Sequence, residues 1–276
     1  MIFSTPHDRK GKKAGFIGLM AVAFSCASAA FCVDSTGHWQ LANVSSRSEW
    51  NEFNAVGRIL VHESGPLIGA ALSAAYDCDK WHYLAGITQL NGTRIYDGKT
   101  NNGAPAISQS TIQQRFFQVQ AIRKITDTWK LGTRLSNQTL WREIASIDSA
   151  AGYPERFDWT LLSLGAQWHS ELGPGQLTIQ AWSGKQLQSR MVLTLPGRDQ
   201  TSLALSSMSQ IELAAGWRMQ LNPAWHLQAD IGYRHSEMAQ GSPTVITRGG
   251  SPTGVAYQPK TVMLDRPISI QIGFEF

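Results

Sequence analysis

Two residues early in the chain have the types and spacing of a catalytic pair. His62 and Ser64 lie in the segment LVHESG, residues 60–65. Residues two apart on a β-strand point to the same face, so a histidine there could take the proton of a serine hydroxyl and activate it as a nucleophile. The same segment, followed by Pro66, equally fits a strand end and a tight turn with no chemistry. The sequence therefore suggests a hydrolase hypothesis but assigns no catalytic residue.

A second possible site combines acidic residues with a histidine. Asp97 and Asp148 occur in polar, glycine-containing segments, and His235 precedes Ser236 and Glu237. The sequence has no His-x-x-x-His pair, no Cys-x-x-Cys pair and no phosphate-binding glycine loop. We therefore expect no metal and no cofactor, and we favour a protein that is not an enzyme.

The first thirty residues predict export. A basic segment at 7–13 precedes an apolar run at 14–24 and the triplet Ala27-Ser28-Ala29, so residues 1–30 fit a signal peptide. The alternatives are an uncleaved anchor, for which the run is short, and a lipoprotein cut before Cys26. Cleavage removes four basic residues and one acidic residue and leaves a net charge near +1. The basic character thus belongs mainly to the leader, and nucleic acid is not an expected partner.

The rest of the chain alternates with the period of β-strands. In residues 268–276 the even positions are apolar and the odd positions polar or small, and residues 211–221 and 225–234 show the same period. Turn signals separate ten such segments. The predicted strands are 55–63, 67–77, 81–91, 111–124, 129–144, 156–171, 176–188, 201–221, 225–238 and 261–276.

The connections sort by length. If the first strand starts on the periplasmic side, all periplasmic connections are short (77–80, 125–128, 172–175 and 222–224), and the outer ones are mostly long (91–110, 145–155, 189–200 and 239–260). The remaining outer connection is a tight turn predicted at 63–66. Short periplasmic turns, long outer loops and an even strand number are typical of transmembrane barrels.

Aromatic residues predict two interfacial girdles. Trp81, Trp129 and Trp225 each begin a strand after a short turn, and Phe276 ends the last strand at the same level. These four predict the periplasmic girdle. The outer girdle is predicted from Tyr96, Trp141, Tyr153, Phe157 and Trp159.

The end of the chain resembles a known protein class. The last strand carries Phe274 and closes on Phe276, which resembles the C-terminal strand of Gram-negative outer-membrane β-barrel proteins, where this strand is the assembly signal. The resemblance implies an all-β fold, a transmembrane antiparallel up-and-down β-barrel of about ten strands, with eight or twelve as alternatives. It also implies location in the cell outer membrane, with outer-membrane lipids, lipopolysaccharide and the barrel-assembly machinery as partners.

This topology sets the expected domains and a disulfide. We predict a signal peptide at 1–30, a periplasmic N-terminal tail at 31–54 and a single outer-membrane barrel at 55–276. Cys32 in the tail and Cys78 in a periplasmic turn then lie on one side, and we predict that they form a disulfide; the alternative is two free thiols. The oligomeric state is left open.

The same alternation predicts the lumen. If Phe274 and Phe276 face lipid, Glu275 points inward. A barrel of about ten strands is scarcely wider than side chains can fill, so we expect a filled, ion-paired interior that serves as a scaffold, with a narrow channel as the alternative. The predicted lumen ion network is Lys130, Arg134, Glu212, Arg218, Asp230, Arg234 and Glu275.

Two enzyme families share features with this chain. Omptin proteases are ten-stranded barrels that use two acidic residues and a His–Asp pair, but Asp97 stands alone here and His235 has Glu237 instead of the expected aspartate. Outer-membrane phospholipases carry a His-x-Ser-Asn-Gly motif, and the residue after Ser64 is Gly65, so the asparagine is missing. We therefore favour a non-enzymatic barrel with a structural, channel or surface role, and keep a surface hydrolase as the alternative.

Overall fold

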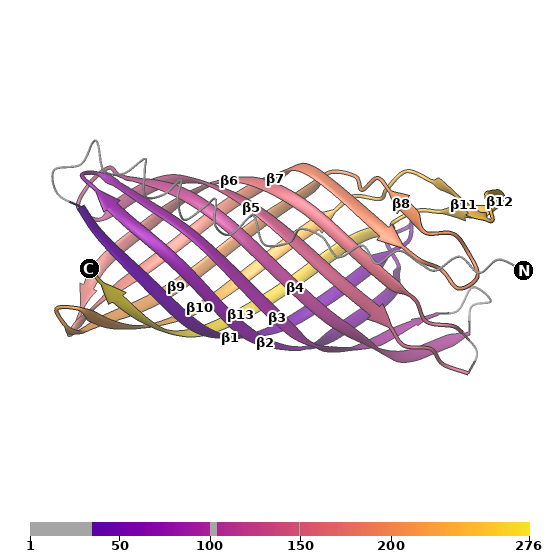
Figure 1. Cartoon of the computed structure of the whole chain (residues 1–276), viewed down its shortest axis with the longest axis horizontal. Helices are drawn as coiled ribbons and strands as arrows, with labels where there is room; N and C mark the ends of the chain where they lie inside the picture. The colour runs from indigo at the N-terminus through magenta and orange to yellow at the C-terminus, as the bar shows by residue number, and fades with distance from the viewer. Residues whose placement is uncertain (1–34, 100–103, 149) are drawn as a thin grey trace, which may run out of the picture.

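The structure is a computed structural model that describes residues 35–99, 104–148 and 150–276. These residues form a closed antiparallel β-barrel of ten strands (Figure 1). No helix long and apolar enough to cross a membrane occurs in these ranges. The barrel strands are β1 (Ser35–Phe53), β2 (Ile59–Cys78), β3 (Trp81–Lys99), β4 (Pro105–Lys124), β5 (Trp129–Ile144), β6 (Pro154–Leu172), β7 (Gly175–Leu193), β9 (Met208–Asn222), β10 (Trp225–Met238) and β13 (Lys260–Glu275).

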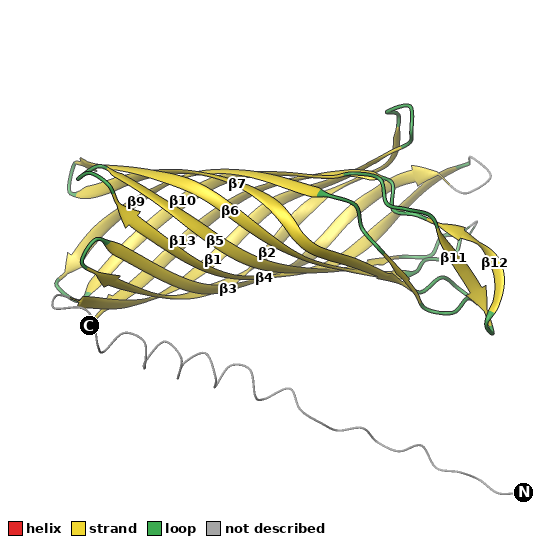
Figure 2. Cartoon of the chain, turned by 90° about the horizontal axis from the view of Figure 1, so that it is seen from above, coloured by secondary structure: helices red, strands yellow, loops and turns green. Residues whose placement is uncertain are grey.

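The barrel closes on itself by antiparallel pairing of β1 with β13. Every barrel strand thus has two neighbours, which leaves no exposed edge of unpaired backbone groups. Three short strands lie outside this wall. β8 (Thr201–Leu203) pairs with the end of β7, and β11 (Thr244–Arg248) and β12 (Ser251–Ala256) form a separate hairpin that projects beyond one end of the barrel (Figures 1 and 2).

The two ends of the barrel differ. One end, here called the turn end, holds the start of β1, the end of β13 and four short connections at 79–80, 125–128, 173–174 and 223–224. The other, the loop end, holds the connections 54–58, 100–104, 145–153, 194–207 and 239–259, which include β8, β11 and β12. The predicted ten-stranded antiparallel barrel is confirmed.

The first two strands differ from the prediction. Residues 35–53, predicted as part of a tail, form β1, and β2 continues through the predicted turn at 63–66. The ladder between β2 and β3 is interrupted at Gly65 and Pro66, because proline has no N–H to donate. A side chain on Gly65 would collide with the Thr93 carbonyl oxygen, so glycine permits the close approach of β3. The Gly-Pro pair thus marks an irregularity inside a strand.

The outward face carries a belt of exposed apolar side chains, here called the apolar band. It includes Leu41, Ile68, Leu164, Ile231 and Ile270, which are 57–66% exposed. Such a surface suits contact with hydrocarbon and not with water.

Exposed aromatic residues border the apolar band at the turn end. Trp81, Trp129 and Trp225 are 39–48% exposed there. The predicted outer girdle is largely wrong. Phe157 and Trp159 occupy the inward positions of β6 and are 0% and 3% exposed, so they pack inside the barrel.

Candidate functional site

The inside of the barrel is crossed by side-chain contacts between strands that are not neighbours in the wall. Arg134 on β5 binds Glu212 on β9, with 2.8 Å between Nη1 and Oε1. The rings of Trp50 on β1 and Phe157 on β6 lie 5.1 Å apart. The alternating inward residues therefore meet across the lumen. They form four layers of side chains, described here in order from the turn end to the loop end.

The first layer, at the turn end, is a histidine-rich mouth. The ring of His38 lies 6.0 Å from that of His82 and 5.9 Å from that of His226. Arg218 forms an ion pair with Glu275 and also contacts His226 Nδ1 at 3.2 Å. His38 and His226 are 6% and 0% exposed, so these groups pack against each other.

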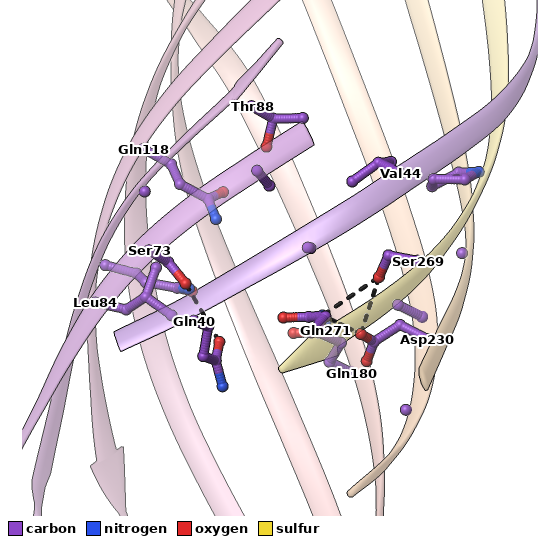
Figure 3. A pocket seen from close by; sticks show the side chains of 18 of the residues that line it. Gln40, Val44, Ser73, Leu84, Thr88, Gln118, Gln180, Asp230, Ser269 and Gln271 are labelled. Atoms are coloured by element: carbon purple, nitrogen blue, oxygen red, sulfur yellow. Dashed lines mark hydrogen bonds between the residues drawn. The ribbon is translucent and has the colours of Figure 1, made fainter. Parts of the chain in front are cut away.

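The second layer surrounds a polar cavity of about 380 Å³. Ten glutamines contribute to its lining. Figure 3 labels four of them, Gln40, Gln118, Gln180 and Gln271. Asp230 is held there by Gln228, Ser269 and Gln271, all neutral donors. The side-chain amides of the ten glutamines provide both hydrogen-bond donors and acceptors. The glutamines are Gln40, Gln118, Gln120, Gln138, Gln167, Gln176, Gln180, Gln210, Gln228 and Gln271.

An arginine–glutamate brace crosses the cavity on its loop-end side. Glu212 accepts from Arg134 Nη1 at 2.8 Å and from Arg234 Nε at 3.0 Å. Each guanidinium also lies 4.7 Å from an aromatic ring on another strand, Trp182 for Arg134 and Phe116 for Arg234. One carboxylate thus fixes two cations that come from opposite walls.

The third layer is apolar and tightly packed. Its members come from seven different strands and are between 0% and 5% exposed. Apolar side chains that are buried to this extent leave no room for a column of water between them. The members are Leu67, Leu90, Ile112, Leu140, Leu161, Met238 and Met263.

The fourth layer, near the loop end, is a buried ion cluster centred on Arg142. Its guanidinium contacts Glu63 at 2.7 Å, Glu155 at 2.8 Å and Glu52 at 3.0 Å. The ring of Trp50 lies 5.1 Å from the same guanidinium. All four partners are at most 9% exposed.

A second arginine enters this cluster. Arg94 Nη1 lies 3.8 Å from Glu63 Oε2, and Arg94 Nη2 donates to Ser48 Oγ at 2.7 Å. Ser48 in turn donates to Asp265 on the neighbouring strand. Three glutamates and two arginines therefore share one buried region that joins β1, β2, β3, β5 and β6.

The structure places the seven residues of the predicted lumen network inside the barrel, in separate groups. Arg134, Glu212 and Arg234 form the brace, and Arg218 pairs with Glu275. Lys130 and Asp230 line the cavity and belong neither to the brace nor to the Arg218–Glu275 pair.

Sequence reasoning missed the Arg142 cluster. Its members fell in the predicted tail, turn and loops: Glu52, Glu63, Arg94 and Glu155. Arg142 lay well inside a predicted strand and Glu63 only at the end of one, and the even position that Arg142 shares with Arg134 is the signal that could have placed it inside.

The structure does not assemble one catalytic site from the four candidate residues. His62, Ser64, Asp97 and His235 all occupy outward positions. His62 lies opposite Asp97 in the β2–β3 register, whereas β10, which carries His235, is separated from β3 by β2, β1 and β13. His235 lies opposite the exposed Ile211 in the apolar band.

One unforeseen contact involves His62. Its Nδ1 lies 2.7 Å from Oδ1 of Asn51, which is opposite it on β1. An asparagine on the neighbouring strand thus contacts His62, while the motif position after Ser64 remains Gly65. No hydrogen bond joins His62 to Ser64 in the part of the chain that the structure describes.

The described residues contain one disulfide-bonded cysteine and no candidate metal site. Cys78 is disulfide-bonded at the turn end. Cys32, its predicted partner, lies outside the described residues, so the pairing stays a prediction. Within residues 35–99, 104–148 and 150–276, no group of three or more His, Cys, Asp or Glu side chains could hold a metal ion.

Comparison with known proteins finds likeness in fold. No protein-family model and no curated protein matches the sequence. The barrel superposes on the outer membrane protease OmpT from Escherichia coli with a TM-score of 0.53 and 10% identity, over 88% of this chain and 96% of that one. The translocator domain of the autotransporter NalP from Neisseria meningitidis gives 0.46 and 10% identity, over 94% and 96%. The chain thus has the fold of outer-membrane barrels.

Proposed function

We propose that this protein is an integral barrel of a Gram-negative outer membrane, with a closed lumen and a structural or surface-presenting role. The turn end faces the periplasm and the loop end faces outward, in keeping with the short and long connections at the two ends. The apolar band contacts lipid, and the assembly signal at Phe274 and Phe276 directs insertion. The leader at 1–30 and the barrel-assembly machinery are the export route in this proposal.

The observation that carries the proposal is the packing of the loop-end half of the lumen. Trp50, Leu67, Ile112, Arg142 and Phe157 meet there from five strands and are 0–2% exposed. An ion crossing this region would have to displace a salt-bridge cluster and an apolar layer together. A scaffold function explains why both layers are filled, and the narrow-channel alternative loses support.

Fractionation combined with liposome swelling tests the proposal. The full chain should be found in the outer-membrane fraction and migrate differently on gels before and after heating. Proteoliposomes that contain it should swell in small sugars no faster than empty liposomes, while a general porin reconstituted in parallel should swell rapidly. Recovery in the soluble periplasm, or swelling comparable to the porin, would contradict it.

A surface ester hydrolase is the second candidate, and the Asn51–His62 contact favours it. With Nδ1–H of His62 donating to Asn51, Nε2 is the nitrogen that would accept the Ser64 proton. The serine oxygen would attack an acyl ester carbonyl, Nε2 would pass the proton to the leaving alcohol, and water would then release the acid. The three residues lie on the outward face toward the loop end, where lipid esters of the outer leaflet are the nearest substrates.

Serine and histidine variants test this candidate. Hydrolysis of phospholipid and of a soluble acyl ester should be detectable in the purified protein and fall at least 100-fold in Ser64→Ala and His62→Ala, as expected when a nucleophile or its base is removed. Ser45→Ala, an outward serine on β1, is the matched control. Absence of activity, or full activity in Ser64→Ala, would refute the candidate and leave the scaffold proposal intact.

A further inference from the structure

The outward wall of β4 to β7 carries a group of charged residues and one tryptophan toward the loop end. We define the outer arginine patch as Arg115 on β4, Trp141 on β5, Arg156 and Asp158 on β6, and Arg190 on β7. In the register of the wall, Trp141 lies opposite Arg156, and Asp158 lies opposite Arg190. The four strands are consecutive, so these side chains form one continuous surface.

The members of the patch hold each other in place. The guanidinium groups of Arg115 and Arg156 lie 5.4 Å and 5.3 Å from the Trp141 ring. Asp158 accepts from Arg156 Nη2 at 2.9 Å and from Arg190 Nη2 at 3.4 Å. The two arginine side chains stay 46% and 57% exposed, whereas that of Asp158 is only 18% exposed. The carboxylate is covered, and the cations remain accessible.

The patch also carries excess positive charge. The patch contains three guanidinium groups and one carboxylate, so two positive charges are not balanced within it. Another outward arginine group on β1 and β13 differs. There Glu49 accepts from Arg266 at 2.6 Å and lies 3.9 Å from Arg47, which leaves a single excess charge.

The position of the patch relates it to the membrane. On β4, Arg115 comes two residues beyond Phe117 toward the loop end, and on β6 Asp158 comes four residues beyond Leu162, which is 46% exposed. Each residue of a strand advances about 3.3 Å. On β4 and β6 the patch therefore lies just beyond these apolar residues on the loop-end side, which in the proposed orientation is the level of the lipid headgroups, where tryptophan is typical.

We propose that the outer arginine patch binds the phosphate groups of an anionic glycolipid of the outer leaflet, of the lipopolysaccharide type. The inference rests on the proposed outer-membrane location and names a lipid site within it. Guanidinium groups bind phosphate with two parallel hydrogen bonds. Arg156 and Arg190 are oriented by Asp158, so little side-chain freedom remains to be lost when a phosphate binds. A lipid with two phosphates matches the two excess charges.

Lipid binding by the full-length protein tests the proposal. The protein is reconstituted in nanodiscs of zwitterionic phospholipid, and the binding of bisphosphorylated lipid A is measured against that of the same lipid without phosphates. We expect tight binding only of the phosphorylated form. Arg156→Gln combined with Arg190→Gln should weaken it by roughly thirtyfold, from about fivefold for each basic residue near a membrane surface.

Control variants separate the patch from general charge effects. Arg47→Gln, on the far wall, should leave the affinity within about twofold, because that side chain is 72% exposed and outside the patch. Arg156→Lys combined with Arg190→Lys keeps the charge and should lose less affinity for the phosphorylated lipid than Arg156→Gln combined with Arg190→Gln. Heat-dependent gel migration confirms that each variant is a folded barrel.

Several outcomes would overturn the lipid site. These are equal binding of both lipid forms, equal affinity of the glutamine pair and the wild type, or an equal loss in Arg47→Gln. Complete displacement by millimolar inorganic phosphate would assign the patch to a free anion and also overturn the lipid. A folded, membrane-inserted barrel that shows any of these results refutes the patch alone, whereas failure to insert refutes the proposed function.

Discussion

Replacing Arg142 with methionine should destabilise the barrel more than replacing any outward arginine. Methionine keeps much of the apolar stem but removes the guanidinium that contacts Glu52, Glu63 and Glu155 at 2.7–3.0 Å. The Arg142 side chain is 1% exposed, so water cannot take its place. Breaking a buried ion pair by removing one partner costs about 3–5 kcal/mol. For a chain of this size that corresponds to a fall in the unfolding midpoint of roughly 10 °C.

The assay is equilibrium unfolding of the purified barrel in detergent, followed by its heat-dependent gel migration. Arg115→Met is the matched control, because Arg115 lies on the outward face and its loss should change stability by no more than about 0.5 kcal/mol. Adding Glu155→Gln to Arg142→Met should restore at least about 1 kcal/mol, since it removes a carboxylate whose charge the lost guanidinium balanced. Equal stability of Arg142→Met and Arg115→Met would refute the view that this cluster holds the loop-end half together.

Three further results are expected. Glu212→Gln should lower stability by about 2–4 kcal/mol in the same assay, because the buried Arg134 and the partly buried Arg234 lose their shared carboxylate; a change below about 0.5 kcal/mol would contradict the brace. Hydrogen bonds from the Thr247 hydroxyl and from the Gly250 and Gly249 amides lower the pKa of Asp199, so the contact between these outer loops should persist at neutral pH and be lost only as pH falls through that lowered value. Limited proteolysis of the loops should report this loss, and Asp199→Asn should be cleaved faster already at pH 7; equal cleavage of the variant and the wild type would contradict it. Thiol labelling of the mature protein should require reductant. In Cys78→Ser, Cys32 should be labelled without reductant, because its predicted partner is missing. Labelling of the wild type without reductant would argue against the predicted disulfide.

The sequence predicted the barrel because most strands have one lipid-facing apolar side. Period two is visible wherever an apolar outward residue alternates with a polar inward one, as in β13. β1 hides this signal toward its loop end. There Ser46 and Ser48 point inward while Arg47 and Glu49 point outward, so both faces are polar and the segment reads as a tail.

The interior could be predicted only in part. Strand parity placed Arg134 and Glu212 on the inward side, but it could not show that they meet, because that distance depends on strand tilt and closure. The girdle prediction for Phe157 and Trp159 rests on the frequency of aromatic residues at membrane interfaces. In β6 both residues occupy the alternate positions that point inward. The Asn51–His62 contact depends on the register of β1, a strand that the alternation did not reveal.

Single-channel recording in planar bilayers tests the central claim most directly. The account predicts that the purified full-length barrel inserts but gives no conductance steps, because the Arg142 cluster and the apolar layer beneath it fill the lumen. A general porin recorded under the same conditions supplies the positive control. Reproducible conductance steps from the inserted wild-type barrel would contradict a closed lumen.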